Sequence, residues 1–233
     1  MLWIPQRSLL FIHNPKCAGT AVHKALLEAF PDAQEFWGRA YLRKTDGIVD
    51  LAHLTIGDAQ QLIASDLPIR SFGFVRNPYR RFLSSFRYFK RWNAEYDALT
   101  LEELAFDVLD EERIRCDWKY VHFSPQYRFF YVDGQREVSR IYRVEDLPKA
   151  WGRVRAAFDI DAELRRENQE DARGKWLPDR VIARINTLYA RDFAYFGYAM
   201  RPVSPRPVPR PYPAFSTLWP EYRALDVSDH NRS

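Results

Sequence analysis

Short apolar runs alternate along this chain with segments in which apolar residues recur every three or four positions. Leu9–Ile12 is a continuous apolar run that ends shortly before Asn14–Pro15, which predicts a buried strand followed by a turn. After Gly19 an apolar residue recurs at every fourth position, which predicts an amphipathic helix. Strand, tight turn and helix in this order are typical of the start of a parallel α/β sheet.

A second segment repeats the same plan. Phe72–Val75 predicts another strand, and Asn77 and Pro78 are suited to the N-cap and the first position of a helix that runs to about Trp92. The two units together predict an α/β protein with a P-loop-like, three-layer fold, in which helices flank a central, mostly parallel sheet.

The remaining pattern predicts further elements of the same kind. The spacing of Thr100 and Glu103 predicts a capping box at the start of a helix over Leu101–Leu109. We also expect a strand at Val138–Tyr142, a helix around Trp151–Phe158 and a last helix that begins at Pro178.

The character of the chain changes near residue 200. Residues 201–213 contain six of the 15 prolines, which excludes a helix or a central strand there. We therefore predict one domain over residues 1–200 and a proline-rich C-terminal arm and tail over residues 201–233.

Composition narrows the class of protein. The 233 residues are 46% hydrophobic, 28% charged and 15% aromatic, which fits a soluble globular protein. Net charge is 35 − 31 = +4, compatible with an anionic ligand. Two cysteines, Cys17 and Cys116, make no disulfide framework, and neither a signal peptide nor a membrane span is evident, so a cytoplasmic location is expected.

Both predicted strand-to-helix turns carry the parts of a phosphate site. In the first, Lys16 offers a mobile charge, Gly19 lets the backbone approach a ligand, and Thr20 offers a hydroxyl at a helix N-terminus. The spacing differs from the Walker motif and lacks its magnesium-binding hydroxyl. In the second turn, Arg76 is placed to bind another phosphate, and Ser84 can add a hydroxyl. The other basic residues of this helix are expected to form a solvated face: Arg80, Arg81, Arg87, Lys90, Arg91.

Five segments, in order, resemble the sulfotransferase superfamily, and most closely its carbohydrate-type branch with heparan 2-O- and chondroitin/HNK-1-type enzymes. FIHNPKCAGT resembles the 5′-phosphosulfate loop and FVRNPYRRFLSSF the 3′-phosphate signature. VHFSPQ, IYRVEDL and DFAYFGY resemble three later motifs, so the likeness spans about residues 9–198. Cys17 departs from the pattern, in which Thr is commoner, but the backbone supplies most of the contacts at that position.

The resemblance implies a donor, 3′-phosphoadenosine 5′-phosphosulfate (PAPS), and an acceptor hydroxyl, with no metal. The 5′-phosphosulfate would lie on the first turn, and Arg76 and Ser84 would bind the 3′-phosphate. Arg173, in a basic stretch with Gly174 and Lys175, would close over the nucleotide. The expected residues of the first turn are Lys16, Cys17, Ala18, Gly19, Thr20 and Ala21.

A histidine is the expected base for the acceptor hydroxyl, because its ordinary pKa lies near physiological pH. In heparan 2-O-type relatives a histidine between the two phosphate motifs has this role, which implies His53, with Lys16 stabilising the leaving oxygen. His122 is the alternative base. His13 is expected to hold the first turn, and His23 to lie on the surface.

Two alternatives to a sulfotransferase stay open at this stage. One is a P-loop-like nucleotide kinase or hydrolase, and the other is a sulfotransferase-like protein that binds ligands without transferring a group. No nucleic-acid partner is expected, since no basic aromatic platform is evident. The acceptor is expected to be a carbohydrate or glycan, while a lipid-linked glycan or a small metabolite remains possible.

Overall fold

Five strands form the central sheet. A computed structural model describes residues 1–42, 47–65, 67–93, 96–165 and 177–203. The strand order is β3-β1-β2-β6-β9, in which β2, β6 and β9 are parallel, while β1 pairs antiparallel with both β2 and β3. The strands are β1 Leu2–Ile4, β2 Leu9–Ile12, β3 Gln34–Glu35, β6 Arg70–Val75 and β9 Arg140–Arg143. The predicted α/β class with helices around a central, mostly parallel sheet is confirmed.

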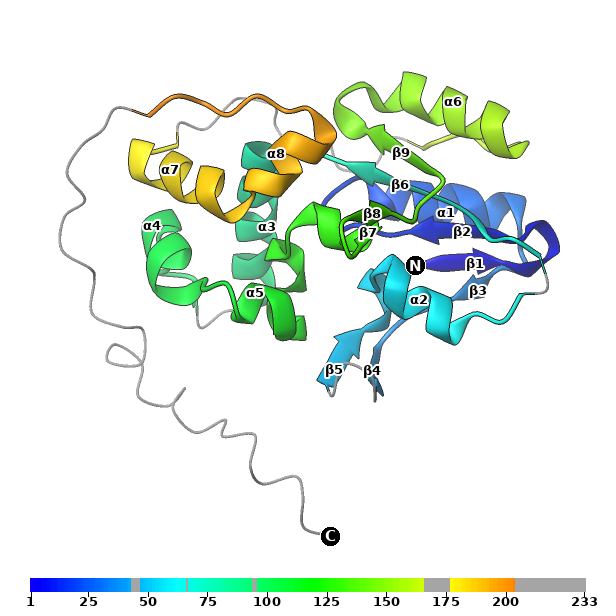
Figure 1. The fold of residues 1–233 in the computed structure, drawn as a ribbon, viewed down its shortest axis with the longest axis horizontal. Coiled ribbons are helices and arrows are strands. Elements are labelled where there is room, and N and C mark those ends of the chain that lie inside the picture. Colours follow the sequence, from blue (N-terminus) through cyan, green and yellow to red (C-terminus); the bar gives the residue numbers. More distant parts are fainter. Residues whose placement is uncertain (43–46, 66, 94–95, 166–176, 204–233) are drawn as a thin grey trace, which may run out of the picture.

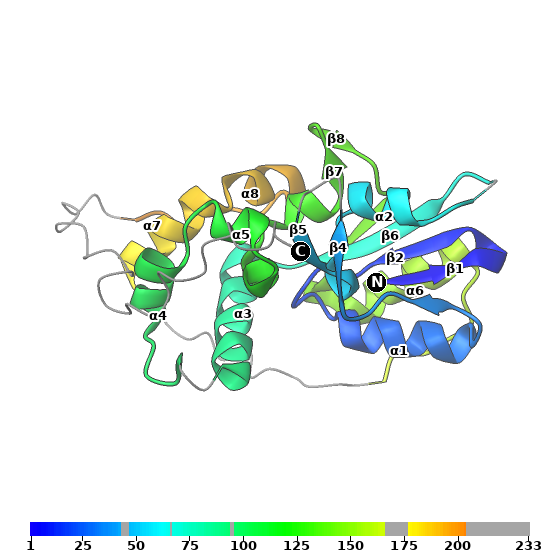
Figure 2. The ribbon, with the colours of Figure 1, turned by 90° about the horizontal axis from the view of Figure 1, so that it is seen from below.

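Alternate side chains of the strands face opposite layers, as the pleat of a strand requires. Leu9 and Phe11 pack with helices α1 (Gly19–Ala29) and α6 (Leu147–Phe158), whereas Leu10 and Ile12 pack with α2 (Ile56–Leu62). Figures 1 and 2 show α1 and α6 on one side of the sheet and α2 on the other. The continuous apolar run at β2 therefore follows from burial on both faces.

A group of helices lies beside the sheet and has its own apolar core (Figure 1). Its helices are α3 Pro78–Trp92, α4 Leu101–Glu103, α5 Arg113–Cys116, α7 Asp179–Leu188 and α8 Ala190–Phe196, with a π-helix, η4, over Leu104–Val108. Among the described residues, none of the helices combines the length and apolar character needed to cross a bilayer.

Small elements complete the fold. Two hairpins pair β4 Arg39–Leu42 with β5 Gly47–Asp50, and β7 Tyr131–Val132 with β8 Gln135–Arg136. The 3-10 helices are η1 Pro5–Arg7, η2 Leu51–His53, η5 Trp118–Phe123, η6 Gln126–Phe129 and η7 Val144–Asp146. The apolar pattern predicted none of these elements, because each contains too few residues to show a period.

Two predicted helices differ from the observed ones. The helix expected from Pro178 is divided at Tyr189, whose φ of −114° and ψ of 24° end α7 and whose hydroxyl donates to the carbonyl of Phe123 over 2.8 Å. The helix expected over Leu101–Leu109 has its predicted capping box but widens to the π-helix after Glu103. The predicted third strand begins two residues late, at Arg140.

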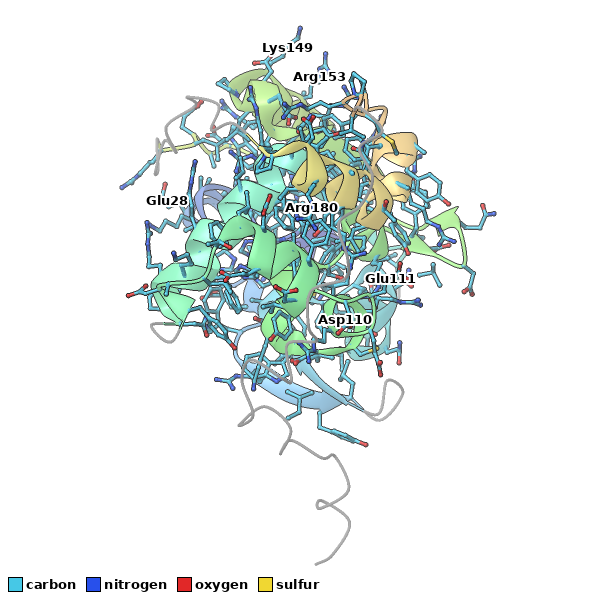
Figure 3. All side chains as sticks on the ribbon, turned by 90° about the vertical axis from the view of Figure 1, so that its left-hand side faces the viewer. Glu28, Asp110, Glu111, Lys149, Arg153 and Arg180 are labelled. Atoms are coloured by element: carbon cyan, nitrogen blue, oxygen red, sulfur yellow. The ribbon has the colours of Figure 1, made fainter. Side chains whose placement is uncertain are left out.

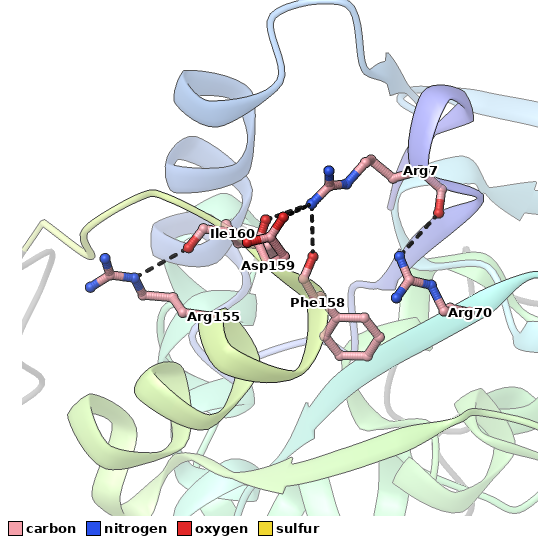
Figure 4. A network of polar contacts seen from close by, with 6 residues as sticks. All are labelled: Arg7, Arg70, Arg155, Phe158, Asp159 and Ile160. Carbon is pink, nitrogen blue, oxygen red and sulfur yellow. Dashed lines mark hydrogen bonds and ion pairs between the residues drawn. The ribbon is translucent and has the colours of Figure 1, made fainter.

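Arg7 ties the end of α6 to the turn between β1 and β2. Its Nη2 atom donates to the carbonyls of Phe158 and Asp159 and contacts the Asp159 carboxylate at 2.9 Å (Figure 4). Because the Arg7 guanidinium joins the turn after β1 to the end of α6, about 150 residues later in the sequence, it fixes α6 on its face of the sheet. Figure 3 shows other charged side chains of α6, Lys149 and Arg153, pointing away from the fold.

Asp192 of α8 joins the helical group to the segment that precedes β7. Its two carboxylate oxygens accept the backbone N–H groups of Gln126 and Tyr127 at 2.8 and 2.9 Å, and its side chain is fully buried. Loss of this carboxylate would leave both N–H groups buried without an acceptor.

We predict that Asp192→Ala lowers the free energy of unfolding by about 3 kcal/mol, because each orphaned N–H group costs about 1–3 kcal/mol. Urea unfolding followed by circular dichroism measures the change. Asp32→Ala, at an exposed turn residue, is the control and should stay within about 0.5 kcal/mol of the wild type. Equal stability of the two variants would contradict the role given to Asp192.

The same carboxyl should make stability depend on pH. Burial raises the pKa of Asp192 from 3.8 to about 6, against the opposing effect of Arg81 and the two N–H donors. Between about pH 4 and 6 the folded protein therefore holds a proton on Asp192 that the unfolded chain releases, so the contribution of this residue to stability falls as pH rises through the window. The buried histidines titrate in the same range in both proteins, so urea titrations should show that the stability of the wild type relative to Asp192→Asn falls from about pH 4 to 6.

Candidate active site

The two predicted turns lie next to each other at one edge of the sheet. Strands β2 and β6 are adjacent and parallel, with Ile12 opposite Gly73, so both turns leave the sheet at its carboxyl edge. Arg76, at the second turn, donates from Nη1 to the carbonyl of Lys16 in the first over 3.3 Å. The structure thus brings together Lys16 and Arg76, which are 60 residues apart in the sequence.

The backbone of the first turn is bent into an unusual shape. Lys16 and Ala18 both have a left-handed conformation, with φ of 62° and 60°. Non-glycine residues seldom adopt it, and such strain concentrates at ligand sites. No side chain caps the start of α1, where Gly19 is buried, Ala21 half-buried and Thr20 exposed. Left-handed residues before a helix N-terminus form a backbone concavity suited to an anion.

Gly19 is required by the ring of His13. A Cβ atom at Gly19 would lie 1.8 Å from Nε2 of His13, a separation that no side chain tolerates. The ring thus occupies the space that a side chain at position 19 would fill. His13 was expected to hold the turn by a hydrogen bond, but the bond that its carbonyl accepts comes from His53 in η2, and its own Nδ1 has no partner among the described residues.

A network of hydrogen bonds from two buried side-chain amides holds the two turns together. Gln126 is fully buried, accepts the backbone N–H of Arg76 at 2.9 Å and donates to the carbonyl of Arg76 at 2.8 Å. Asn14 donates from Nδ2 to the carbonyl of Phe74 at 2.8 Å and to Oε1 of Gln126 at 3.2 Å. These bonds join the end of β6 to the first turn through one pair of side-chain amides.

Cys17 belongs to this buried network. Its Sγ atom lies 3.2 Å from Nδ2 of Asn14 and 3.4 Å from Oε1 of Gln126. Burial raises the pKa of its thiol to about 12, so the thiol is protonated and unreactive at neutral pH. Only the backbone of Cys17 remains for contact with a ligand.

Helix α3 places its basic residues differently from the prediction. Arg80 is exposed as expected, but Arg81 is only 2% exposed, and its Nε donates to the carbonyl of Pro15 over 3.0 Å. The expected solvated face is therefore wrong at Arg81, because that position of α3 faces the first turn. Ser84, one turn further on, is also buried.

Three histidines from three segments meet beside the first turn. His53 donates from Nδ1 to the carbonyl of His13 over 2.8 Å, and its Nε2 lies 3.2 Å from Nε2 of His122. The ring centroid of His53 lies 4.6 Å from the ring centroid of His13 and 5.0 Å from that of His122. The predicted base and its alternative are therefore neighbours.

All three rings are neutral at physiological pH. Burial lowers the pKa of His53 to about 4, and it lowers the pKa of His13 and of His122 well below the ordinary value of 6.5. A neutral imidazole has a lone pair that can accept a proton. The cluster can therefore provide a base without prior deprotonation.

His23 lies in this neighbourhood and not on the surface. It is 7% exposed, its Nε2 is 2.7 Å from Oε2 of Glu35, and its ring centroid is 6.3 Å from that of His13. The surface prediction is wrong because β3, an unpredicted strand, and the exposed ring of Trp37 cover this side of α1.

The side chains of Lys16 and His122 meet at one aromatic ring. Nζ of Lys16 lies 4.3 Å from the ring centroid of Tyr88 in α3, and the same ring is 4.3 Å from that of His122. A cation in contact with an aromatic face is stabilised by the ring quadrupole. The cation of the first turn and the histidine pair thus face the same small region.

A hollow elsewhere on the sheet is separate from this group of side chains. A hollow of about 580 Å³ between β9 and α6 is lined by arginines 136, 140 and 153, and none of the histidines borders it. In the described ranges, no three His, Cys, Asp or Glu side chains are grouped to hold a metal ion. Arg173, with Gly174 and Lys175, lies outside the described residues.

The residues that support the site were not predicted from the sequence. Asn14 lay within the first motif, but nothing local indicated that its side chain points inward. Gln126 ends the VHFSPQ segment and Asp192 begins the DFAYFGY segment. Both residues therefore lay within motifs, but no function was predicted for either side chain. For Arg81 the sequence held no signal, because exposure depends on which helix face meets the turn.

Comparison with known proteins gives one match. A family model described as "Sulfotransferase family" matches residues 1–199. No curated protein and no solved structure matches the chain.

We predict that Gly19→Ala lowers the free energy of unfolding by about 1–3 kcal/mol, because the added methyl group must displace the His13 ring. Gly152→Ala in α6 is the matched control: its Cβ would meet no atom within 4 Å, and the exchange should stabilise the helix by about 0.5–1 kcal/mol. Urea unfolding measures both. A Gly19→Ala variant as stable as the Gly152→Ala variant would show that the His13 ring does not occupy the space beside position 19.

Proposed function

Because this chain belongs to the sulfotransferase family, we propose that it transfers a sulfuryl group from PAPS to an acceptor hydroxyl on a carbohydrate or glycan. The observation that carries the proposal is the contact between the two phosphate-type turns, 3.3 Å between Nη1 of Arg76 and the carbonyl of Lys16. A nucleotide with phosphates at both its 3′ and 5′ positions needs two such sites side by side.

The first turn would bind the 5′-phosphosulfate. Lys16 supplies the charge, Thr20 an exposed hydroxyl, and the uncapped start of α1 supplies N–H groups and the positive end of the helix dipole. Cys17, Ala18, Gly19 and Ala21 would contribute through the backbone alone. The left-handed residues of the turn support this role, since turns that contain left-handed residues commonly form backbone concavities that bind anions.

The second turn would bind the 3′-phosphate. Arg76 is half-buried at the carboxyl end of β6, where both its N–H and its carbonyl are held by Gln126. A fixed backbone orients the guanidinium, which favours a bidentate grip on phosphate. Ser84 would add its hydroxyl from α3. Arg173 is proposed to close over the nucleotide.

Sulfuryl transfer depends on alignment and on charge stabilisation. Lys16 would stabilise the bridging oxygen as negative charge grows on the leaving 5′-phosphate. His53 would serve as base, and its neutral state, with Nδ1 bonded to the His13 carbonyl, keeps a lone pair at Nε2. No step requires a metal.

Exposed rings near the histidines support a saccharide acceptor. Trp37 packs against His23 and Trp92 against Tyr88, and these tryptophans are 67% and 69% exposed. Flat rings with exposed faces suit the apolar faces of sugars. Arg39 of β4 lies 4.1 Å over the ring of Trp118, a pair that would favour an acidic sugar.

We predict that adenosine 3′,5′-bisphosphate raises the melting temperature of the protein in EDTA more than ADP or ATP does. Ligand at a hundred times its Kd adds about 2.7 kcal/mol to the free energy of unfolding. Arg76→Ala should abolish the selective shift because the 3′-phosphate loses its cation. Differential scanning fluorimetry measures the effect.

Arg80→Ala is the matched control, since Arg80 is an arginine four residues further along, in the first turn of α3, and is exposed. It should keep the full shift. No shift with the 3′,5′-bisphosphate, or a larger one with magnesium and ATP, would contradict the donor proposed here and favour a nucleotide kinase or hydrolase.

We predict that His53→Ala retains its affinity for adenosine 3′,5′-bisphosphate while kcat falls at least roughly a hundredfold, since a positioned base contributes about 10²–10⁴-fold. Transfer of radioactive sulfate from PAPS to unsulfated chondroitin and heparosan oligosaccharides would report turnover. Near-normal turnover in the variant would remove His53 from the mechanism.

A further inference from the structure

The contact between His53 and His122 determines where each ring carries its hydrogen. Nδ1 of His53 lies 2.8 Å from the carbonyl oxygen of His13, which can only accept, so Nδ1 carries the hydrogen. Nε2 of a neutral His53 is then a lone pair. Since Nε2 of His122 lies 3.2 Å from it, the hydrogen of a neutral His122 is on Nε2.

This assignment leaves one lone pair of the histidine pair unused. Nδ1 of His122 is buried and has no hydrogen-bond partner among the described residues. Buried polar atoms in folded proteins nearly always have a partner, and a catalytic role is one of the recognised reasons for an exception. The unused lone pair belongs to the ring that packs on Tyr88, next to Lys16.

The charges around the two rings differ. The charged and titratable groups that act on them are Asp50, Lys16, Arg81, His13 and the amino group of Met1. For both rings burial is the main cause of a lowered pKa, but Asp50 and the His13 carbonyl oppose it at His53 alone. At His122 the neighbouring charges, Lys16 among them, all act in the same direction as burial. A proton is therefore held better by His53 than by His122.

We propose that His122 and His53 form a proton relay, in which His122 takes the proton of the acceptor hydroxyl and His53 stores its charge. The inference rests on the proposed sulfuryl transfer and deepens it. His53 remains the base that ends with the proton, but it receives the proton through His122, which is the catalytic residue that meets the acceptor.

The step balances as follows. The O–H bond of the acceptor breaks, and its proton bonds to Nδ1 of His122, while the hydrogen on Nε2 of His122 passes to Nε2 of His53. The acceptor oxygen bonds to sulfur, and the bond from sulfur to the bridging oxygen breaks with its electron pair left on the 5′-phosphate. His53 ends as an imidazolium bonded to the His13 carbonyl, and His122 ends neutral.

The position of Lys16 fits this relay. Its ammonium lies 4.3 Å from the centre of the Tyr88 ring, which also contacts His122. The cation for the leaving oxygen and the base for the attacking oxygen would thus flank one reaction centre, as in-line transfer requires. The acceptor would reach Nδ1 of His122 past the Tyr88 ring, which packs on His122 and belongs to a residue that is 36% exposed.

The tautomers can be tested without donor or acceptor. Long-range proton–nitrogen NMR of ¹⁵N-histidine-labelled protein, at pH 7–8, should show hydrogen on Nδ1 of His53 and on Nε2 of His122, with His53→Gln and His122→Gln supplying the assignments. A neutral His122 with hydrogen on Nδ1, or a neutral His53 with hydrogen on Nε2, would overturn the relay. This outcome is independent of whether the protein binds PAPS.

Kinetics then separate a relay from a structural role. Sulfate transfer from p-nitrophenyl sulfate to adenosine 3′,5′-bisphosphate releases a stable phenolate and needs no base, whereas hydrolysis of PAPS removes a proton from water. His122→Gln should slow hydrolysis about a hundredfold and leave the p-nitrophenyl sulfate reaction within about threefold of wild type.

His23→Gln is the control, since His23 is a buried histidine next to the cluster but not one of its three members, and its Nε2 bonds to Glu35. Both of its rates should match those of the wild type. Equal loss of both rates in His122→Gln, or loss of neither, would overturn the relay. A wild type that catalyses neither reaction and does not bind adenosine 3′,5′-bisphosphate would instead contradict the proposed function, and the tautomers would still decide the geometry of the pair.

Discussion

The side-chain amide of Gln126 holds the two turns in one arrangement. Both hydrogen-bonding groups of the Arg76 backbone end on this amide, and its oxygen also accepts from Asn14. The backbone N–H of Gln126 in turn donates to the carboxylate of Asp192. Each of these groups is buried or half-buried, so any slip of one turn would leave polar atoms unpaired. A network of this kind allows one register only.

The site combines this rigid support with groups that gain their chemistry from burial. Removal from water keeps the three clustered histidines neutral and the Cys17 thiol protonated, and it leaves Arg81 as a cation inside the protein beside the first turn. A buried cation is costly unless an anion or hydrogen-bond acceptors compensate it. Here the carbonyl of Pro15 does so in part, and an anionic donor on the first turn would add to the compensation.

Much of the fold could be read from periodicity, and the rest could not. The two strand-turn-helix units are long and strongly patterned, so β2, β6, α1 and α3 were predicted close to their observed bounds. The hairpins, η2 and η5 are too short for a period, although η2 and η5 carry His53 and His122. The division of the last helix at Tyr189 depends on a hydrogen bond to Phe123, 66 residues away.

The sequence by itself determined the residue types at each strand end: a lysine, glycine and threonine at one turn, and an arginine with a serine eight residues later at the other. Their motifs identified the family, because local spacing along the chain is what a motif records. Only the tertiary structure decided which side chains meet. Arg81 and His23 turned out to be buried, and His53 and His122 to be in contact, because burial and proximity depend on the packing of segments distant in sequence, which no local pattern encodes.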